Sequence, residues 1–163
     1  MSKAPSTNAT RLLRQQGVPF TEHLYRYEDQ GGTRVSAREL GVSEHAVIKT
    51  LVMEDDKAAP LIMLMHGDLE VSTQALARQL GVKSMQPCKP ETAQRHSGYQ
   101  VGGTSPFGTK KIMPVYAEAS IFDLERIYIN GGSRGFLVEL DPKKLDEVLT
   151  VARVKVGLNS ASK

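Results

Sequence analysis

The sequence predicts a mixed α/β fold in which short helices surround a curled, mixed β-sheet. Segments with strand patterns outnumber the helical ones, and the helices interrupt the strands at irregular intervals. Regular alternation would favour a doubly wound parallel sheet, so its absence favours a mixed sheet. The 163 residues suit one domain with a sizeable core. We expect a single domain over residues 1–163, with its core at about residues 18–156.

Five segments carry the start and stop signals of short helices. Ser6 or Thr7 can cap a first helix that carries Leu12 and Leu13 and stops at Gly17. In the other segments, a polar residue or proline stands at the start, or a glycine stands directly after the end. These further helices are expected over residues 33–40, 71–80, 90–97 and 142–149.

Strands are expected where apolar and β-branched residues alternate with polar ones or form short continuous runs. Glu54–Lys57 is a polar turn between two such runs, which are therefore expected to form a hairpin. Gly131 and Gly132 lie in the loop of a second expected hairpin. The expected strands cover residues 18–27, 46–53, 60–65, 82–86, 112–116, 126–129, 136–140 and 151–156. Residues 1–5 and 157–163 are expected to be loose ends.

The composition argues against several classes of protein. A single cysteine, Cys88, cannot form an internal disulfide, which suits a reducing compartment. The longest apolar run, at residues 60–65, is far too short to span a membrane, and no secretory signal is visible at the N-terminus. The net charge of +3 permits contact with a polyanion. We therefore expect a cytoplasmic protein with no membrane partner.

The stretch GYQVGGTSPFGTKKIMP at residues 98–114 is a candidate binding loop. Adjacent Gly102 and Gly103 allow positive φ angles and close approach of a ligand, and Pro106 stiffens the loop. Such a loop presents backbone N–H groups to a carbonyl, a ribose or a phosphate; the alternative is a glycine-rich turn between strands. A nucleotide P-loop is rejected because its Lys-Ser/Thr pair is missing and no helical pattern opens there.

A second loop and one lysine are also unusual. The loop Asn130–Gly135 again contains adjacent glycines, and we hypothesise that the two loops face one cleft. Lys49 occupies the centre of an apolar strand, on the face shared by Val47, Leu51 and Met53. A charged amine there must reach solvent, pair with an acid or meet a ligand. The alternative is an edge strand on which Lys49 faces solvent and hinders aggregation.

The sequence contains no motif in which side chains are spaced for metal binding or for nucleophilic catalysis. The histidines are scattered, with no cysteine or carboxylate at ligand spacing, so no metal site is expected. Cys88 has no partner indicated by the sequence, so an incidental thiol is favoured over a nucleophile. The four histidines are His23, His45, His66 and His96.

Three motifs, taken together, resemble a known family. They are Lys49-Thr50-Leu51, the glycine motif at residues 98–111, and Gly131-Gly132-x-Arg134-Gly135. Over roughly residues 20–149 the chain resembles the YbaK/EbsC-type aminoacyl-tRNA deacylases, which are related to the editing domain of bacterial prolyl-tRNA synthetases. The resemblance implies a barrel-like mixed sheet. It also implies trans-editing, the hydrolysis of the ester between a wrong amino acid and tRNA, typically Cys-tRNA(Pro).

The resemblance further implies roles for residues at matching positions. Lys49 is implied to contact the terminal-adenosine end of the tRNA, and the Gly103 N–H to hold the substrate carbonyl. An N–H preorganised toward a developing oxyanion is a strong catalytic device. The terminal ribose hydroxyl, or the thiol of a misattached cysteine, can assist, so neither a protein nucleophile nor a cofactor is implied. The implied substrate-binding residues are Tyr25, Thr50, Gly102, Thr104, Ser105, Pro106, Asn130, Gly131, Gly132 and Leu137.

Two positions depart from the family pattern and leave alternatives open. Leu137 stands where the best-known members have aspartate, and Asn130 replaces a frequent serine. The choice of amino acid is therefore open, and release of alanine alongside cysteine is expected. One alternative is a non-catalytic tRNA- or nucleotide-binding module; another is a hydrolase of a different small acyl ester, with Cys88 or Ser105 as nucleophile. Action alone or docked on prolyl-tRNA synthetase is also left open.

Overall fold

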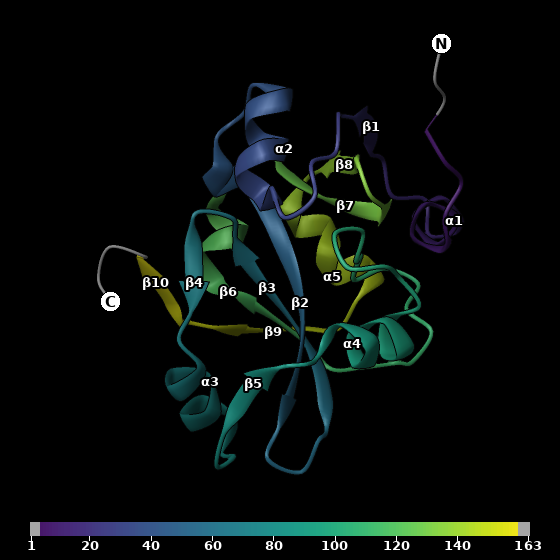
Figure 1. Cartoon of the computed structure of the whole chain (residues 1–163). Coiled ribbons are helices and arrows are strands. Elements are labelled where there is room, and N and C mark those ends of the chain that lie inside the picture. Colours follow the sequence, from purple (N-terminus) through teal and green to yellow (C-terminus); the bar gives the residue numbers. More distant parts are fainter. Residues whose placement is uncertain (1–3, 160–163) are drawn as a thin grey trace.

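The computed structural model describes residues 4–159 and shows a mixed α/β fold, which confirms the predicted fold class (Figure 1). The strands are β1 (Thr21–Leu24), β2 (Val47–Asp55), β3 (Pro60–His66), β4 (Leu69–Val71), β5 (Met85–Pro87), β6 (Val115–Glu118), β7 (Ile127–Ser133), β8 (Phe136–Leu140), β9 (Val151–Val154) and β10 (Gly157–Asn159). The helices are α1 (Asn8–Gln15), α2 (Gly32–Leu40), α3 (Thr73–Leu80), α4 (Pro90–Ser97) and α5 (Leu145–Val148), with short 3₁₀ turns η1 (Glu44–Ala46), η2 (Ala119–Asp123) and η3 (Pro142–Lys144).

One sheet of eight strands forms the centre of the molecule. Its strands follow the order β1-β8-β7-β2-β3-β6-β9, and β5 also pairs with β2. β2 is antiparallel to β3 and parallel to β7, whereas β3, β6 and β9 run parallel to one another. β1 and β9 lie at the two ends of this order, so the description as a barrel fits only loosely. β4 and β10 form a separate two-stranded sheet.

Most local predictions of helices and hairpins are confirmed. The Thr7 and Ser72 side chains accept hydrogen bonds from backbone N–H groups at the starts of α1 and α3. Gly41 directly follows α2 in the left-handed conformation, as expected for a helix stop. The hairpins β2–β3 and β7–β8 form as expected. Within residues 4–159, no helix is both long and apolar enough to cross a membrane.

Several predicted boundaries are wrong, chiefly where pairing with distant segments decides the outcome. β1 has four residues instead of the predicted ten, because it pairs only with the five-residue β8. The predicted last helix divides into the turn η3 and the four-residue α5. Residues 157–159 form β10 by pairing with β4, and are not a loose end. The loose ends predicted at residues 1–3 and 160–163 lie outside the described residues.

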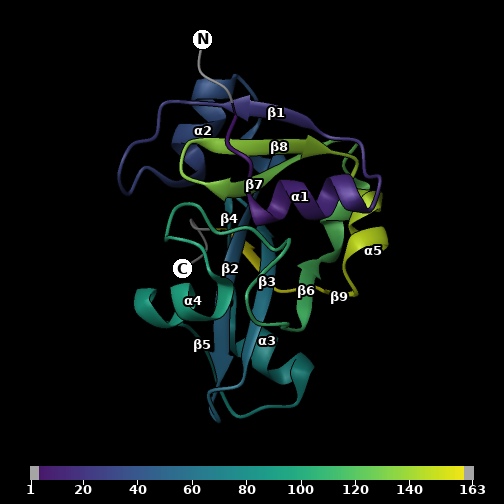
Figure 2. The same cartoon turned by 90° about the vertical axis from the view of Figure 1, so that its right-hand side faces the viewer.

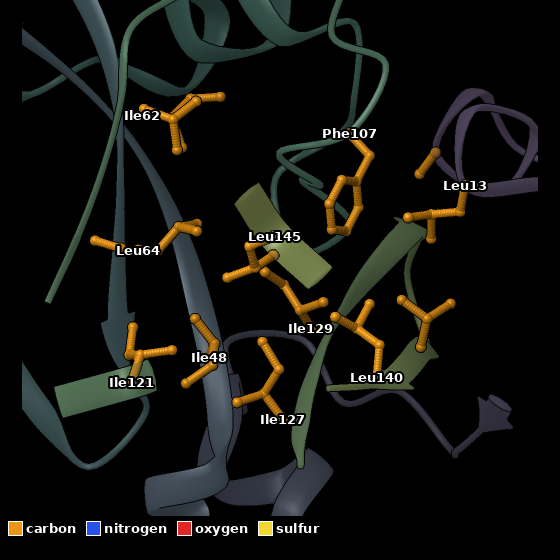
Figure 3. Packing of buried hydrophobic residues seen from close by; sticks show 14 of the residues in the cluster. Leu13, Ile48, Ile62, Leu64, Phe107, Ile121, Ile127, Ile129, Leu140 and Leu145 are labelled. Carbon is orange, nitrogen blue, oxygen red and sulfur yellow. The ribbon is translucent and has the colours of Figure 1, made fainter. Parts of the chain in front are cut away.

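Apolar clusters cover both faces of the β2–β3 hairpin. Ile48 and Leu64 belong to the larger cluster, which also contains Phe107 of the segment 98–111, named here the glycine loop (Figure 3). Met53 and Met63 belong to a second cluster, together with apolar residues of α3. The alternation of faces along the strands follows from their two-residue period. Because both of its faces are packed, the hairpin holds the residues between these clusters in fixed positions.

The sheet branches at β2, and this branch positions the candidate site. β3 pairs with one side of β2 along residues 48–54. On the other side, β7 pairs only at Val47 and Ile48, and β5 pairs only at Met53–Asp55. The two neighbours thus leave a gap in the sheet beside residues 49–51. Lys49 lies on a central strand at this gap, so the alternative of an outer edge strand is not supported.

Candidate active site

A cleft of about 560 Å³ opens where the sheet branches. One wall is the segment from Tyr25 into α2, and the strand β2 crosses the cleft. The opposite side consists of the β5–α4 connection and the glycine loop. Seven of the predicted site residues line this cleft: Tyr25, Lys49, Thr50, Gly102, Thr104, Asn130 and Leu137. The structure therefore gathers residues that are up to 112 positions apart in the sequence (137 − 25).

Lys49 and Thr50 bring two different polar groups to the gap. Lys49 is partly buried and supplies a positive charge within the cleft. The Thr50 hydroxyl oxygen is buried, and it has no hydrogen-bond partner among the described residues. A buried hydroxyl without a partner costs about 1–3 kcal/mol, so such groups call for a specific explanation. A bound ligand that pairs with Thr50 would remove this cost.

The two glycine-containing loops are fastened together by side chains of the second loop. The Asn130 side chain donates from Nδ2 to the Gly102 carbonyl at 3.2 Å, and its Oδ1 accepts from the Gly132 N–H at 2.7 Å. Arg134 donates from Nε to the Val101 carbonyl at 2.8 Å. Gly102 and Asn130 both line the cleft, as hypothesised for two loops that face one cleft.

Gly102 and Gly103 have different surroundings. Gly102 lines the cleft with φ at +89°, and a Cβ atom there would lie 2.5 Å from the Tyr27 hydroxyl oxygen. The Gly103 N–H instead donates to the Gln100 carbonyl at 2.8 Å. A Cβ atom on Gly103 would lie 2.9 Å from the backbone of the second loop, so this glycine allows the loops to touch. The geometry does not support the predicted contact of the Gly103 N–H with a substrate.

Four other predicted residues build the loops and do not line the cleft. The Ser105 hydroxyl is buried and accepts from the Phe107 N–H at 3.2 Å, and Pro106 is buried beside it. Side chains added to Gly131 or Gly132 would strike the rings of Phe136 and Tyr99, respectively. These contacts leave Ser105 no access to a substrate in the cleft, so the alternative of a Ser105 nucleophile is not supported.

Cys88 lies in the cleft, but its environment disfavours a nucleophilic role. Burial raises the pKa of the Cys88 thiol, and the nearby Glu54 carboxylate raises that pKa further. The thiolate is the reactive form of cysteine, so a raised pKa keeps Cys88 unreactive near neutral pH.

Cys88→Ser is therefore expected to keep deacylation within about twofold of the wild type, because no step needs a thiolate at this position. Initial rates at matched protein concentration check this, with Cys88→Ala as a control for the polarity of the hydroxyl. A loss of activity in both variants, with unchanged circular dichroism, would instead support the nucleophile alternative.

Two residues outside the predicted site shape the cleft: Tyr27, and Arg134, which the third motif contains but to which no role was assigned. Tyr27 lines the cleft beside Gly102, and the Arg134 guanidinium lies 5.3 Å from the centre of its ring. This cation–π contact and the Arg134 bond to Val101 hold Tyr27 and the glycine loop in one arrangement. A signal for Tyr27 existed, since two-residue alternation places it on the same face as Tyr25.

Two histidines that are distant in the sequence lie together in the structure, which corrects the prediction of scattered histidines. The rings of His45 and His66 stack at 3.7 Å, and Asp68 lies 2.9 Å from His45 Nδ1. His66 uses both nitrogens, with the His45 carbonyl and the Ser120 hydroxyl. Ligand atoms of His45, His66 and Asp68 lie within 4.8 Å of one another, but the planes of the two stacked imidazoles are nearly parallel, 5° apart, and do not converge on one position. Burial lowers the pKa of His66, and none of the three residues lines the cleft.

Known proteins are similar to this chain in sequence and in fold. The chain is 31% identical over 140 residues to "Putative Cys-tRNA(Pro)/Cys-tRNA(Cys) deacylase EbsC" of Enterococcus faecalis, covering 85% of each chain. It is 34% identical over 95 residues to the proline–tRNA ligase of Thermodesulfovibrio yellowstonii, covering 58% of this chain and 16% of that one. The fold is similar to the crystal structure of "a putative trans-editing enzyme for prolyl tRNA synthetase", with a TM-score of 0.76, 21% identity and coverage of 93% and 99%. Residues 29–148 match the family described as "Aminoacyl-tRNA editing domain", and the chain belongs to that family.

Proposed function

We propose that this protein hydrolyses the ester of mischarged tRNA(Pro), with Cys-tRNA(Pro) as its main substrate and Ala-tRNA(Pro) as a further one. The observation that carries the proposal is the cleft at the branch of the sheet, which Lys49, Thr50 and Gly102 all line. The similarity to the Enterococcus faecalis protein supports cysteine as the amino acid. We further propose that residues 1–163 act as one deacylase domain.

The cleft suits ester hydrolysis without a nucleophilic side chain. Lys49 is assigned to the phosphate at the terminal-adenosine end, for which a compact ammonium is well suited. The Gly102 N–H is assigned to the ester carbonyl, because within residues 4–159 it donates to no other group. As the carbonyl oxygen gains charge in the transition state, this N–H stabilises it. Water supplies a hydroxyl to the acyl carbon and a proton to the departing ribose oxygen, assisted by the substrate's own hydroxyl or thiol.

The proposal is tested by incubating the protein with Cys-tRNA(Pro), Ala-tRNA(Pro) and Pro-tRNA(Pro) and measuring the ester that remains. We expect turnover of the first, slower turnover of the second and none of the third. Binding of tRNA without any turnover would overturn the proposal in favour of a binding module. Repeating the assay with prolyl-tRNA synthetase tests whether docking on the synthetase contributes.

Gly102→Ala is expected to lower kcat by roughly a hundredfold or more, the typical effect of losing one oxyanion donor. The added Cβ would strike the Tyr27 hydroxyl, and an L residue rarely adopts a φ of +89°. The loop must therefore move, and the Gly102 N–H moves with it.

Gly17→Ala is the matched control for this variant. Gly17 has a φ of +68° but no atom within 4 Å of the Cβ position, so it carries backbone strain of about 1 kcal/mol without disturbing the cleft. We expect normal kcat from the control. A Gly102→Ala enzyme that keeps more than about a tenth of the wild-type kcat would argue that its N–H does not face the ester.

A further inference from the structure

We propose that a basic surface beside the cleft binds backbone phosphates of the tRNA acceptor arm and guides its 3′ end to the ester site. This inference rests on the proposed function. The surface consists of four exposed cations that lie directly before α4, on α4 and at the end of the glycine loop, and we name it the α4 surface. Its members are Lys89, Arg95, Lys110 and Lys111.

Backbone hydrogen bonds hold the two parts of the α4 surface together. The Lys110 N–H donates to the Ser97 carbonyl at 3.0 Å, and the Lys111 N–H donates to the His96 carbonyl at 2.9 Å. These bonds satisfy carbonyl groups in the last turn of α4, which the helix itself leaves unpaired. The two lysines are therefore fixed against the helix end rather than carried on a free loop.

The cations of the α4 surface are available to an external anion. Among the described residues, none of the four forms an ion pair, whereas Arg14, Arg38, Arg126 and Arg153 each contact a carboxylate. Glu91 in the first turn of α4 and Glu54 on β2 are acids of this region, so positive charge is in excess. Burial lowers the pKa of His96, and Lys111 and Arg95 lower it further, which agrees with closely spaced positive charges.

The α4 surface continues directly into the cleft. Cys88, Pro90 and Ala93 line the cleft from the same segment that carries Lys89 and Arg95. The glycine loop supplies Gly102 to the cleft and ends in the two lysines. Figure 2 shows α4 and this loop side by side, next to β2 and β5. The cations of the α4 surface therefore lie next to the cleft, within the region that a nucleic-acid strand with its terminal ribose in the cleft can contact.

The chemistry of the α4 surface favours a nucleic-acid backbone. Lysine and arginine side chains that neutralise phosphates release counterions, which makes binding strong at low salt and steeply dependent on salt. Ile112 follows the lysines and exposes 95% of its surface, so it offers an apolar contact to a ribose or an unstacked base. An acidic protein segment is the competing occupant, and the experiment below separates the two.

The test is a double variant, Lys110→Gln with Lys111→Gln, compared with Arg78→Gln plus Lys155→Gln. The control pair is also exposed and removes the same charge, from α3 and the segment after β9. For Cys-tRNA(Pro) we expect KM to rise about tenfold with kcat unchanged, and the slope of log KM against log salt to fall by about one to two. With 2′(3′)-O-cysteinyl-adenosine 5′-monophosphate, which keeps the phosphate assigned to Lys49 but has no acceptor arm, we expect no change. The control pair should behave as wild type.

Binding of uncharged tRNA, followed by fluorescence anisotropy, keeps this proposal separate from the proposed function. If the wild type binds tRNA but hydrolyses no ester, the proposed function fails while the α4 surface is still tested by its affinity. Equal tRNA affinity and salt slope in wild type and double variant would overturn the α4 surface, and would leave an acidic protein as the better occupant. An equal loss of activity on 2′(3′)-O-cysteinyl-adenosine 5′-monophosphate would also overturn it, since the lysines would then act on the cleft itself.

Discussion

Lys49→Ala is expected to lower kcat/KM for Cys-tRNA(Pro) by roughly a hundredfold or more while the protein stays folded. Lys49 is the cation that β2 brings into the cleft, at the point where neither β5 nor β7 pairs with the strand. Its loss removes the charge assigned to the phosphate of the terminal adenosine. The 3′ end of the tRNA is then held less firmly in the cleft. Misplacement of a substrate by about 1 Å costs on the order of a hundredfold in rate.

The fold should tolerate this substitution. Lys49 lies between residues of two apolar clusters, Val47 on one side and Leu51 on the other. Alanine there removes a charged group from partly buried surroundings and keeps the strand. We expect a melting temperature within a few degrees of the wild type, since about 1 kcal/mol shifts it by roughly 2–4 °C in a chain of this size.

Two further variants test whether the effect is specific to the ammonium group of Lys49. Lys49→Arg keeps the charge but replaces a compact ammonium by a planar group, so we expect it to recover only part of the activity. Lys57→Ala removes a lysine from the exposed turn of the same hairpin and should have no effect. Near wild-type turnover by Lys49→Ala would show that the catalytic cleft lies elsewhere.

Local sequence signals predicted much of the fold because they act over only a few residues. The cap at Thr7, the proline that begins α4 and the polar turn between β2 and β3 each specify their own element. Pairing between distant strands carries no such signal. β4 and β10 have three residues each and are far apart in the sequence, so their pairing depends on the folded chain. The prediction of a loose end at residues 157–159 was therefore wrong.

The candidate site likewise contains some residues that sequence motifs indicate and others whose roles depend on the folded backbone. The order of the motifs indicated Lys49, Thr50 and Gly102, and the structure brings all three to one cleft. Sequence alone could not separate Gly102 from Gly103, because neither has a side chain and the direction of each N–H depends on the backbone torsion angles of the loop. Ser105 is polar and adjacent to the site in sequence, yet it is fully buried as part of the loop's own hydrogen bonding.

Leu137→Asp is expected to destabilise the protein by about 3 kcal/mol or more, because it places a charge in apolar surroundings. Leu137 exposes only 4% of its surface and packs with Val47 and Ala37, although it also lines the cleft. The corresponding fall in melting temperature is about 6–12 °C. Leu137→Asn is the matched control, since it has nearly the same shape without the charge, and it should be less destabilised at neutral pH.

The effect of pH on Leu137→Asp identifies the charge as the cause. Burial raises the pKa of an introduced carboxyl above its unfolded value of about 3.9. Below that value the carboxyl is protonated in both states, so the penalty from the charge is absent. The penalty grows as pH rises above about 4 and reaches its full size above the folded-state pKa. Leu137→Asp should therefore approach Leu137→Asn in stability near pH 4 and fall behind it at pH 7.

The same variants test how the cleft selects its amino acid. An apolar wall distinguishes side chains that differ by one methylene only by roughly ten- to two-hundredfold, so we expect the wild type to release alanine as well as cysteine. A polar residue at position 137 changes that wall, and Leu137→Asn should change the ratio of Cys-tRNA(Pro) to Ala-tRNA(Pro) turnover. An unchanged melting temperature with a changed ratio in Leu137→Asp would mean that Leu137 serves the substrate and contributes little to the core. A lowered melting temperature with an unchanged ratio in the surviving folded enzyme would mean the reverse, and would remove Leu137 from the specificity of the site.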